Sequence, residues 1–166
     1  VGTTGDPGNN ANSSGRGPCG DGRWKPNVCA PGTSILSVNS NDLDGYTSKS
    51  GTSMAAPHVT GVASQLVDHY SFVRYEPARL SALMMGTATT KDDQVYTTPS
   101  DANLDNYGAG RIDAYRAHFP DSEALLLNWG FAQGFSGFQS GDFTVDAGAT
   151  RLVIVMHYKE PAASAG

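Results

Sequence analysis

The sequence predicts an α/β fold that is followed by an all-β segment, and three patterns support this prediction. Short apolar runs between residues 28 and 38 are typical of strands. Apolar residues recur at helical spacing after Ser53, and two more helices are expected at 77–88 and 112–118. From residue 143 the pattern becomes alternating and rich in β-branched residues. A chain of 166 residues with these patterns can hold one ordinary domain and part of another.

The first predicted strands lie in the segment NVCAPGTSILSV. Val28 marks one short apolar piece, and Ile35, Leu36 and Val38 mark a second, with a turn at Pro31–Gly32 between them. Both pieces are expected to be buried. The flanking segments are polar and rich in turn-forming residues, which predicts loops, and they are residues 5–26 and 39–50.

The first predicted helix begins at Ser53 and is built largely from small residues. Its larger apolar residues recur at helical spacing, and they are Met54, Val59, Val62, Leu66 and Val67. Because alanine and glycine fill many of the other positions, this helix can lie very close to a sheet. Pro57 is expected within the first helical turn, where a missing N–H is tolerated.

Two further helices and two late strands complete the prediction. Pro77 suits the first turn of a helix that runs to about Ala88, and a short helix is expected from Ile112 to His118. Past a boundary near residue 120, the predicted β segments are Phe143 to Val145 and Leu152 to Tyr158, joined by a turn at residues 146–148.

The composition excludes two classes of partner. The net charge is −5 and no stripe of Lys and Arg appears, so we expect no nucleic-acid binding. No uninterrupted apolar stretch approaches the roughly 20 residues of a membrane-spanning helix, so no membrane span is expected. The sequence begins with Val1 and no signal segment, which fits the middle of a longer protein and is not evidence for the cytoplasm.

Ser53 has the surroundings of a nucleophile. A serine hydroxyl needs a base to take its proton and donors to hold the developing oxyanion. At a helix start the Ser53 backbone N–H is unpaired, and the helix dipole favours nearby negative charge. Gly51 lets the backbone turn, and Ala55 and Ala56 leave room for a substrate. A serine in this place without further context would be an ordinary helix N-cap.

The string GTSMAAPHVTG, residues 51–61, resolves this choice because it closely resembles the nucleophile motif of the subtilisin-like serine proteases, the subtilases. It does not match the Gly-x-Ser-x-Gly motif of α/β-hydrolases, since Ala55 replaces the second glycine. Three other stretches resemble family segments in the expected order, and they are GRGPCGDGRWKPNVCAPGTSILS, LSALMMGTAT and YGAGRIDAYRA. The chain departs from the family pattern at Asn27, where the family often has Asp, and at Gly15, an insertion in a loop.

The resemblance covers residues 1–119 and implies the C-terminal portion of a subtilisin-like peptidase domain. The implied fold is a mainly parallel sheet flanked by helices, incomplete in this chain. Residues 120–166 are similar, less specifically, to a linker and the start of the antiparallel β-sandwich that follows the catalytic domain in some subtilases.

The implied activity is that of a secreted or extracellular serine endopeptidase acting on protein or peptide substrates. Ser53 is the implied nucleophile, within a nucleophile and oxyanion loop formed by Gly51, Thr52 and Ser53. In this family the chain order is Asp, then His, then Ser, so the activating Asp and His and the oxyanion Asn are expected upstream of Val1. No cofactor and no metal site are implied for this chain, and a calcium ion in the parent enzyme is not readable from it.

Other residues in this chain are weaker candidates for the base. His58 lies on the same helix as Ser53 but well around it, and the family string has it as a packing residue. The remaining histidines are too remote along the helix or belong to later elements, and they are His69, His118 and His157. The nearby carboxylates are expected to be solvated loop residues, and they are Asp21, Asp42 and Asp44.

Two alternatives to an active protease remain open at this point. One is a catalytically inactive subtilase relative that serves as a binding module. The other is a secreted β-sandwich adhesion protein, which does not account for the first 119 residues. The sequence upstream of Val1 would decide between them.

Two smaller features also allow alternatives. Cys19 and Cys29 are either two buried thiols or a disulfide across a short loop, and the bridge is carried forward as a hypothesis. The polar residues at 101–106 could suggest calcium ligands, but the EF-hand pattern is absent, and a polar loop with helix-capping side chains is the better interpretation.

Overall fold

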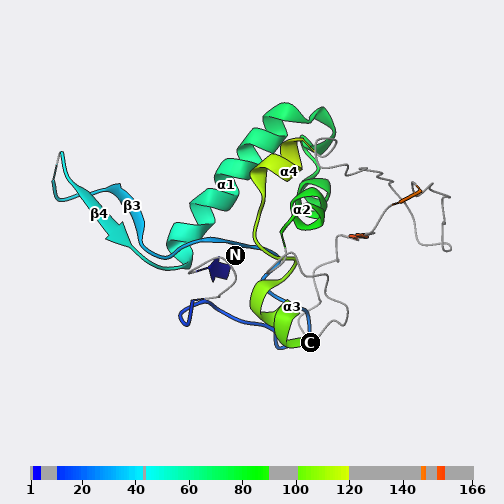
Figure 1. The fold of residues 1–166 in the computed structure, drawn as a ribbon, viewed down its shortest axis with the longest axis horizontal. Helices are drawn as coiled ribbons and strands as arrows, with labels where there is room; N and C mark the ends of the chain where they lie inside the picture. Colours follow the sequence, from blue (N-terminus) through cyan, green and yellow to red (C-terminus); the bar gives the residue numbers. More distant parts are fainter. Residues whose placement is uncertain are drawn as a thin grey trace, which may run out of the picture.

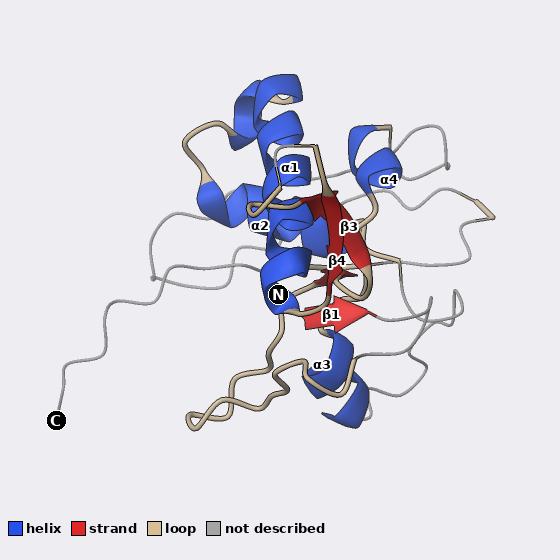
Figure 2. Cartoon of the chain, turned by 90° about the vertical axis from the view of Figure 1, so that its left-hand side faces the viewer, coloured by secondary structure: helices blue, strands red, loops and turns tan. Residues whose placement is uncertain are grey.

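The computed structural model describes residues 2–4, 11–42, 44–89, 101–119, 147–148 and 153–155. The elements in chain order are β1 (Gly2–Thr4), β2 (Cys29–Pro31), β3 (Ile35–Val38), β4 (Tyr46–Lys49), α1 (Thr52–His69), the 3-10 turn η1 (Ser71–Val73), α2 (Pro77–Gly86), α3 (Asp101–Tyr107) and α4 (Ala114–His118). Helices α1, α2 and α4 gather together, and the hairpin β3–β4 projects from the N-terminal end of α1 (Figure 1). Figure 2 shows α3 at the opposite end of the molecule from these three helices. The predicted α/β class is confirmed.

A small parallel sheet lies under α1. Strand β1 pairs in parallel with β2, with Gly2 opposite Cys29 and Thr4 opposite Pro31. The Cys29 N–H donates to the Gly110 carbonyl at 2.7 Å, and the Cys29 carbonyl accepts the Ile112 N–H at 2.9 Å. The segment 110–112 therefore continues the sheet beside β2, in agreement with the parallel arrangement that the resemblance implies.

The hydrophobic core joins the three gathered helices. Leu66 of α1, Val73 of η1, Leu83 of α2 and Ala117 of α4 are all buried and form one cluster. Ala55, near the start of α1, is also fully buried. Because α1 contributes buried residues near both of its ends, the core fixes the direction of the helix that begins beside Ser53.

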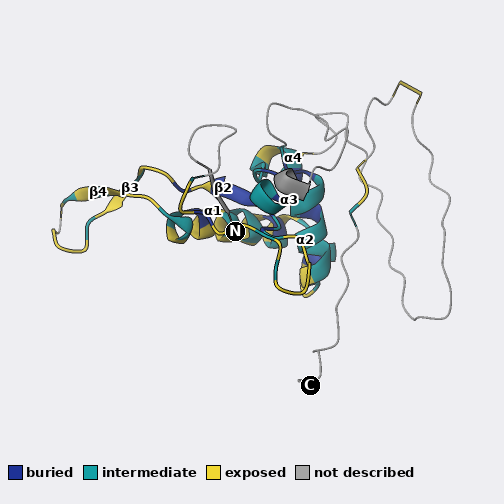
Figure 3. Ribbon diagram, turned by 90° about the horizontal axis from the view of Figure 1, so that it is seen from below, coloured by how far each residue is buried: buried dark blue, intermediate teal, exposed yellow. Residues whose placement is uncertain are grey.

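The hairpin β3–β4 corrects two sequence predictions. Residues 46–49 were predicted to be loop, but they form β4 and pair antiparallel with β3, with Ile35 opposite Lys49. Leu36 and Val38 were predicted to be buried, but they are 66% and 75% exposed. Figure 3 shows most of this hairpin as exposed. The apolar residues of β3 lie on a two-stranded ribbon that no described element covers, so the short apolar run did not indicate burial here.

The ends of the predicted helices agree with the structure to within two residues, and the prediction differs from it in two other places. Helix α1 starts one residue before Ser53, and α2 begins at Pro77 as predicted. Pro57 lies inside α1 rather than in its first turn, so the Ser53 carbonyl is deprived of its usual N–H donor four residues on. The residues predicted as a polar loop at 101–106 are instead part of α3.

The late β prediction falls mostly outside the described residues. The predicted strand at Phe143 to Val145 lies there, and so does most of the predicted β-sandwich. The described residues 147–148 form a turn, as predicted. Residues 153–155 are not in a strand, because no described segment forms a ladder with them. No described helix combines the length and the hydropathy that crossing a bilayer would require.

Candidate active site

Ser53 occupies the second position of α1, and its side chain is exposed. The helix is anchored at its start by Gly51, whose carbonyl accepts the N–H groups of Met54 at 3.0 Å and Ala55 at 3.3 Å. The Ser53 N–H precedes both of these bonds, among the groups that a helix leaves without an internal acceptor. An exposed hydroxyl and an N–H that points out of a helix start are therefore held side by side in one residue.

Gly51 gives the chain its direction into the helix. This residue has φ 150° and ψ 169°, a conformation that is almost confined to glycine. It is the N-cap of α1, and no side chain caps this helix. The turn before Ser53 therefore forms without a side-chain cap on the helix.

A pair of hydrogen bonds closes the base of the hairpin directly before this turn. The Gly51 N–H donates to the Gly32 carbonyl at 2.7 Å. The Ser34 N–H donates to Ser50 Oγ at 2.8 Å. The sequence did not point to Ser34 or Ser50, although the Asp44–Gly45 pair and the β-forming residues at 46–47 are a hairpin signal that would have placed them near each other.

His58 does not approach Ser53. Its Nδ1 lies 2.8 Å from the Met54 carbonyl one turn earlier on the same helix, and because a carbonyl only accepts, this nitrogen is the donor. Residues five apart on a helix are separated by about 140° around its axis. The expectation that His58 is not the base is in accord with this geometry.

The other described histidines lie at the far end of α1. His69 is the last residue of that helix, about 24 Å from Ser53 along the axis at 1.5 Å per residue. His118 packs beside it, with ring centroids 5.2 Å apart, and its Nδ1 donates to the Ala114 carbonyl at 2.9 Å. His157 lies outside the described residues. Among the described residues, no histidine or carboxylate hydrogen bonds to Ser53.

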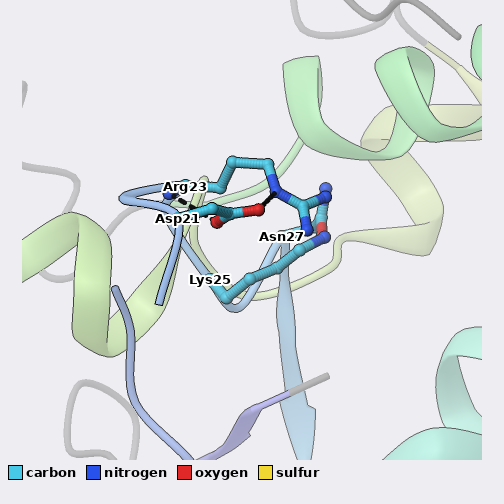
Figure 4. A network of polar contacts seen from close by, with 4 residues as sticks. All are labelled: Asp21, Arg23, Lys25 and Asn27. Carbon is cyan, nitrogen blue, oxygen red and sulfur yellow. Dashed lines mark hydrogen bonds and ion pairs between the residues drawn. The ribbon is translucent and has the colours of Figure 1, made fainter. Parts of the chain in front are cut away.

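The three candidate carboxylates are exposed, as expected. Asp42 and Asp44 lie in the turn of the hairpin, where Asp42 Oδ1 accepts the Asp44 N–H at 3.3 Å. Asp21 accepts the Arg23 N–H at 3.2 Å and Arg23 Nε at 2.6 Å (Figure 4). These bonds from the Arg23 backbone and guanidinium hold the pKa of the Asp21 carboxyl below its usual range.

Asn27, where the family often has Asp, is part of a local polar network. Its side-chain oxygen accepts a hydrogen bond from Lys25 Nζ (Figure 4). Its amide nitrogen donates to Met85 Sδ of α2 at 3.7 Å. The Asn27 carbonyl also accepts the Ala109 N–H at 2.9 Å. Asn27 therefore connects the start of β2 to α2 and to the glycine-rich turn after α3, which is a structural role.

The hypothesis of a disulfide between Cys19 and Cys29 is wrong. The two residues are not bridged. The Cys29 thiol is fully buried and its sulfur lies 3.5 Å from the Tyr107 carbonyl, so it faces α3. Within the part of the chain that the structure describes, no cluster of three or more His, Cys, Asp or Glu side chains could hold a metal ion.

Comparison with known proteins places this geometry in a family. The model of the subtilase family, peptidase S8, matches residues 1–110. Pyrolysin of Pyrococcus furiosus is 36% identical over 106 residues, which cover 63% of this chain and 8% of pyrolysin. The minor extracellular protease Vpr of Bacillus subtilis is 37% identical over 111 residues, which cover 61% of this chain and 13% of Vpr. The chain thus spans a small part of the length of these relatives.

A solved structure agrees with the sequence comparisons. The patellamide maturation protease PatA superposes with a TM-score of 0.52 at 25% identity. The match covers 74% of this chain and 42% of the PatA chain.

Proposed function

The chain belongs to the subtilase family, and we propose that it carries the nucleophile of a subtilisin-like serine endopeptidase, with Ser53 attacking the peptide carbonyl. The observation that supports this assignment best is the combination of an exposed Ser53 at the start of α1 with the glycine-only conformation of Gly51 before it. A nucleophile needs this exposure on a rigid backbone, whereas a capping serine would turn its oxygen back to the helix.

The proposed reaction uses two groups of Ser53. Its hydroxyl oxygen forms a bond to the peptide carbonyl carbon while a histidine takes the proton and an aspartate orients that histidine. The Ser53 N–H donates to the oxyanion, together with an asparagine side chain, and the loop Gly51–Thr52–Ser53 forms this side of the oxyanion hole. Collapse of the tetrahedral intermediate expels the amine, which takes the proton from the histidine, and leaves an acyl-enzyme that water hydrolyses. In this proposal the Asp, His and Asn belong to a part of the parent protein outside these 166 residues.

The substrates of the proposed enzyme are proteins or peptides, and the enzyme works outside the cell. The similarity to an extracellular protease of Bacillus subtilis supports this location. We further propose that residues 1–119 are the C-terminal portion of the peptidase domain and that residues 120–166 are a linker and the start of a β-sandwich. The competing candidate is a catalytically inactive relative that binds peptides, and the observation in its favour is that no described base contacts Ser53.

Labelling with a fluorophosphonate tests the assignment, because this probe reacts with serines that a base has activated. The full-length protein is expected to be labelled at Ser53 and to hydrolyse peptides. Ser53→Ala is expected to lose labelling and to lower turnover by several orders of magnitude, as losses from a catalytic triad generally do. The chain of 166 residues by itself is expected to remain unlabelled.

Three outcomes would contradict the proposal. Near-normal turnover in Ser53→Ala would exclude this residue as the nucleophile. Stoichiometric labelling of the isolated chain would place a base within it and return His58 to consideration. A full-length protein that binds peptides but is never labelled would favour the inactive relative.

A further inference from the structure

The hairpin β3–β4 and the start of α1 are joined at one place. Ser50 Oγ accepts the Ser34 N–H at 2.8 Å, and the Gly51 N–H donates to the Gly32 carbonyl at 2.7 Å. These two bonds, which we call the hairpin clamp, connect residues 32–34 to residues 50–51. They lie just beyond the last strand pair, Ile35 with Lys49.

The clamp holds two backbone conformations that the chain does not adopt readily. Ser34 has φ 54°, in the left-handed region that residues other than glycine seldom occupy. Gly51 has φ 150°. Such conformations persist only where the surroundings determine them from more than one side. The Ser50 hydroxyl is the only side chain among the described residues that hydrogen bonds to the Ser34 N–H.

The distance along the chain from the clamp to the nucleophile is very short. Only Gly51 and Thr52 separate Ser50 from Ser53. Leu66 in the core and the fully buried Ala55 hold α1 from Ala55 onward, whereas Ser53 itself is exposed. The orientation of Ser53 therefore depends on how the chain enters the helix, and the clamp sets that entry.

We propose that Ser50 is a positioning residue for Ser53, and this inference rests on the proposed function. By accepting the Ser34 N–H, the Ser50 hydroxyl holds residues 32–34 against residues 50–51, so that Gly51 directs Ser53 and its N–H toward the substrate carbonyl. Ser50 does not touch the reacting atoms in this proposal.

The test uses the full-length protein with Ser50→Ala and Ser50→Thr. The first change removes the acceptor oxygen and the second retains it. Ser48→Ala is the matched control, because Ser48 is an exposed serine of β4 two residues before Ser50, paired with Leu36 and outside the clamp. The measurements are kcat, KM, the rate of fluorophosphonate labelling, and the hydrogen exchange of the Ser34 amide.

We expect Ser50→Ala to lower kcat and the labelling rate about three- to tenfold, the net value of one hydrogen bond. KM should change little, and exchange of the Ser34 amide should accelerate. Ser50→Thr should recover most of the lost rate, and Ser48→Ala should behave as the unchanged protein. This pattern would establish the positioning role, because a general loss of stability would not separate kcat from KM or spare the threonine variant.

Two results would overturn the inference. Ser50→Ala with unchanged kcat and labelling rate but faster exchange at Ser34 would show that the clamp forms without positioning Ser53. An equal loss in Ser48→Ala would show that the whole hairpin, rather than the Ser50 oxygen, is responsible. If the unchanged full-length protein is not labelled at Ser53, the proposed function fails, and the positioning role fails with it.

Discussion

Substituting Gly51 by alanine should impair the proposed nucleophile, Ser53, without a steric clash. A methyl group at this position would have Met54 Sδ and the Ser53 nitrogen as nearest neighbours, both at 3.9 Å, which is ordinary van der Waals contact. The difficulty is the backbone, since φ 150° with ψ 169° belongs to a region essentially restricted to glycine. Gly51→Ala therefore isolates the conformational demand of the turn that precedes Ser53.

The size of the effect follows from this strain. Holding a residue other than glycine in such a conformation costs about 1–3 kcal/mol. Ser53 and most of the hairpin before it are exposed, so the backbone around Gly51 can relax instead of bearing the strain. Relaxation would depopulate the productive turn by about 5- to 150-fold, since 1.4 kcal/mol is a factor of ten. We expect kcat/KM to fall by a factor in this range.

The control for this experiment is Gly22→Ala. Gly22 also has a positive φ, 83°, and no heavy atom lies within 4 Å of an added methyl group, but the residue belongs to the loop between Cys19 and Arg23. This variant should unfold at lower denaturant concentration and keep normal kcat/KM. Peptide hydrolysis and urea unfolding of the full-length protein provide both measurements. Normal activity in Gly51→Ala would refute the reasoning, and so would equal losses of activity in both variants.

The remaining predictions concern packing. Gly108→Ala should destabilise the protein by more than about 2 kcal/mol, because the residue has φ 58° and an added methyl group would collide with the Pro26 carbonyl oxygen and lie 2.5 Å from the Asn27 carbonyl oxygen. Gly20→Ala, with no atom within 4 Å, should be nearly neutral in the same urea titration. Leu66→Ala should cost about 2–5 kcal/mol since this side chain is fully buried, and Leu36→Ala, at a site 66% exposed, should change the free energy of unfolding by less than about 0.5 kcal/mol.

The helices were predictable because their signals are local. The spacing of Val62, Leu66 and Val67 set α1, and Pro77 marked the start of α2. The hairpin was predictable only in part, since β3 was recognised but β4 was taken as loop. The error in burial has a physical cause, because a short apolar run favours a strand and does not say whether another element covers either of its faces.

The candidate site, like the fold, could be predicted from the sequence only in part. Ser53 could be singled out from the string around it, since its place at the helix start follows from adjacent residues. The bond from Ser34 to Ser50 could not, because it joins positions 16 apart and depends on the hairpin register. The disulfide hypothesis failed for a related reason: sequence spacing permits a bridge, but the fold turns Cys29 toward α3 instead.

The position of Ser53 is controlled mainly by its neighbours. Its N–H precedes the first helical bonds, which run from Met54 and Ala55 to the Gly51 carbonyl. Its carbonyl lacks the usual donor because Pro57 has no N–H. Neither the N–H nor the carbonyl of Ser53 therefore makes the usual helical hydrogen bond. The N–H stays available for an oxyanion, but Ser53 lacks the bonds that normally fix a helical residue. The orientation of Ser53 must then come from Gly51 and the hairpin clamp before it and from the rest of α1 after it. Small changes at Gly51 and Ser50 should therefore alter the rate of the proposed hydrolysis.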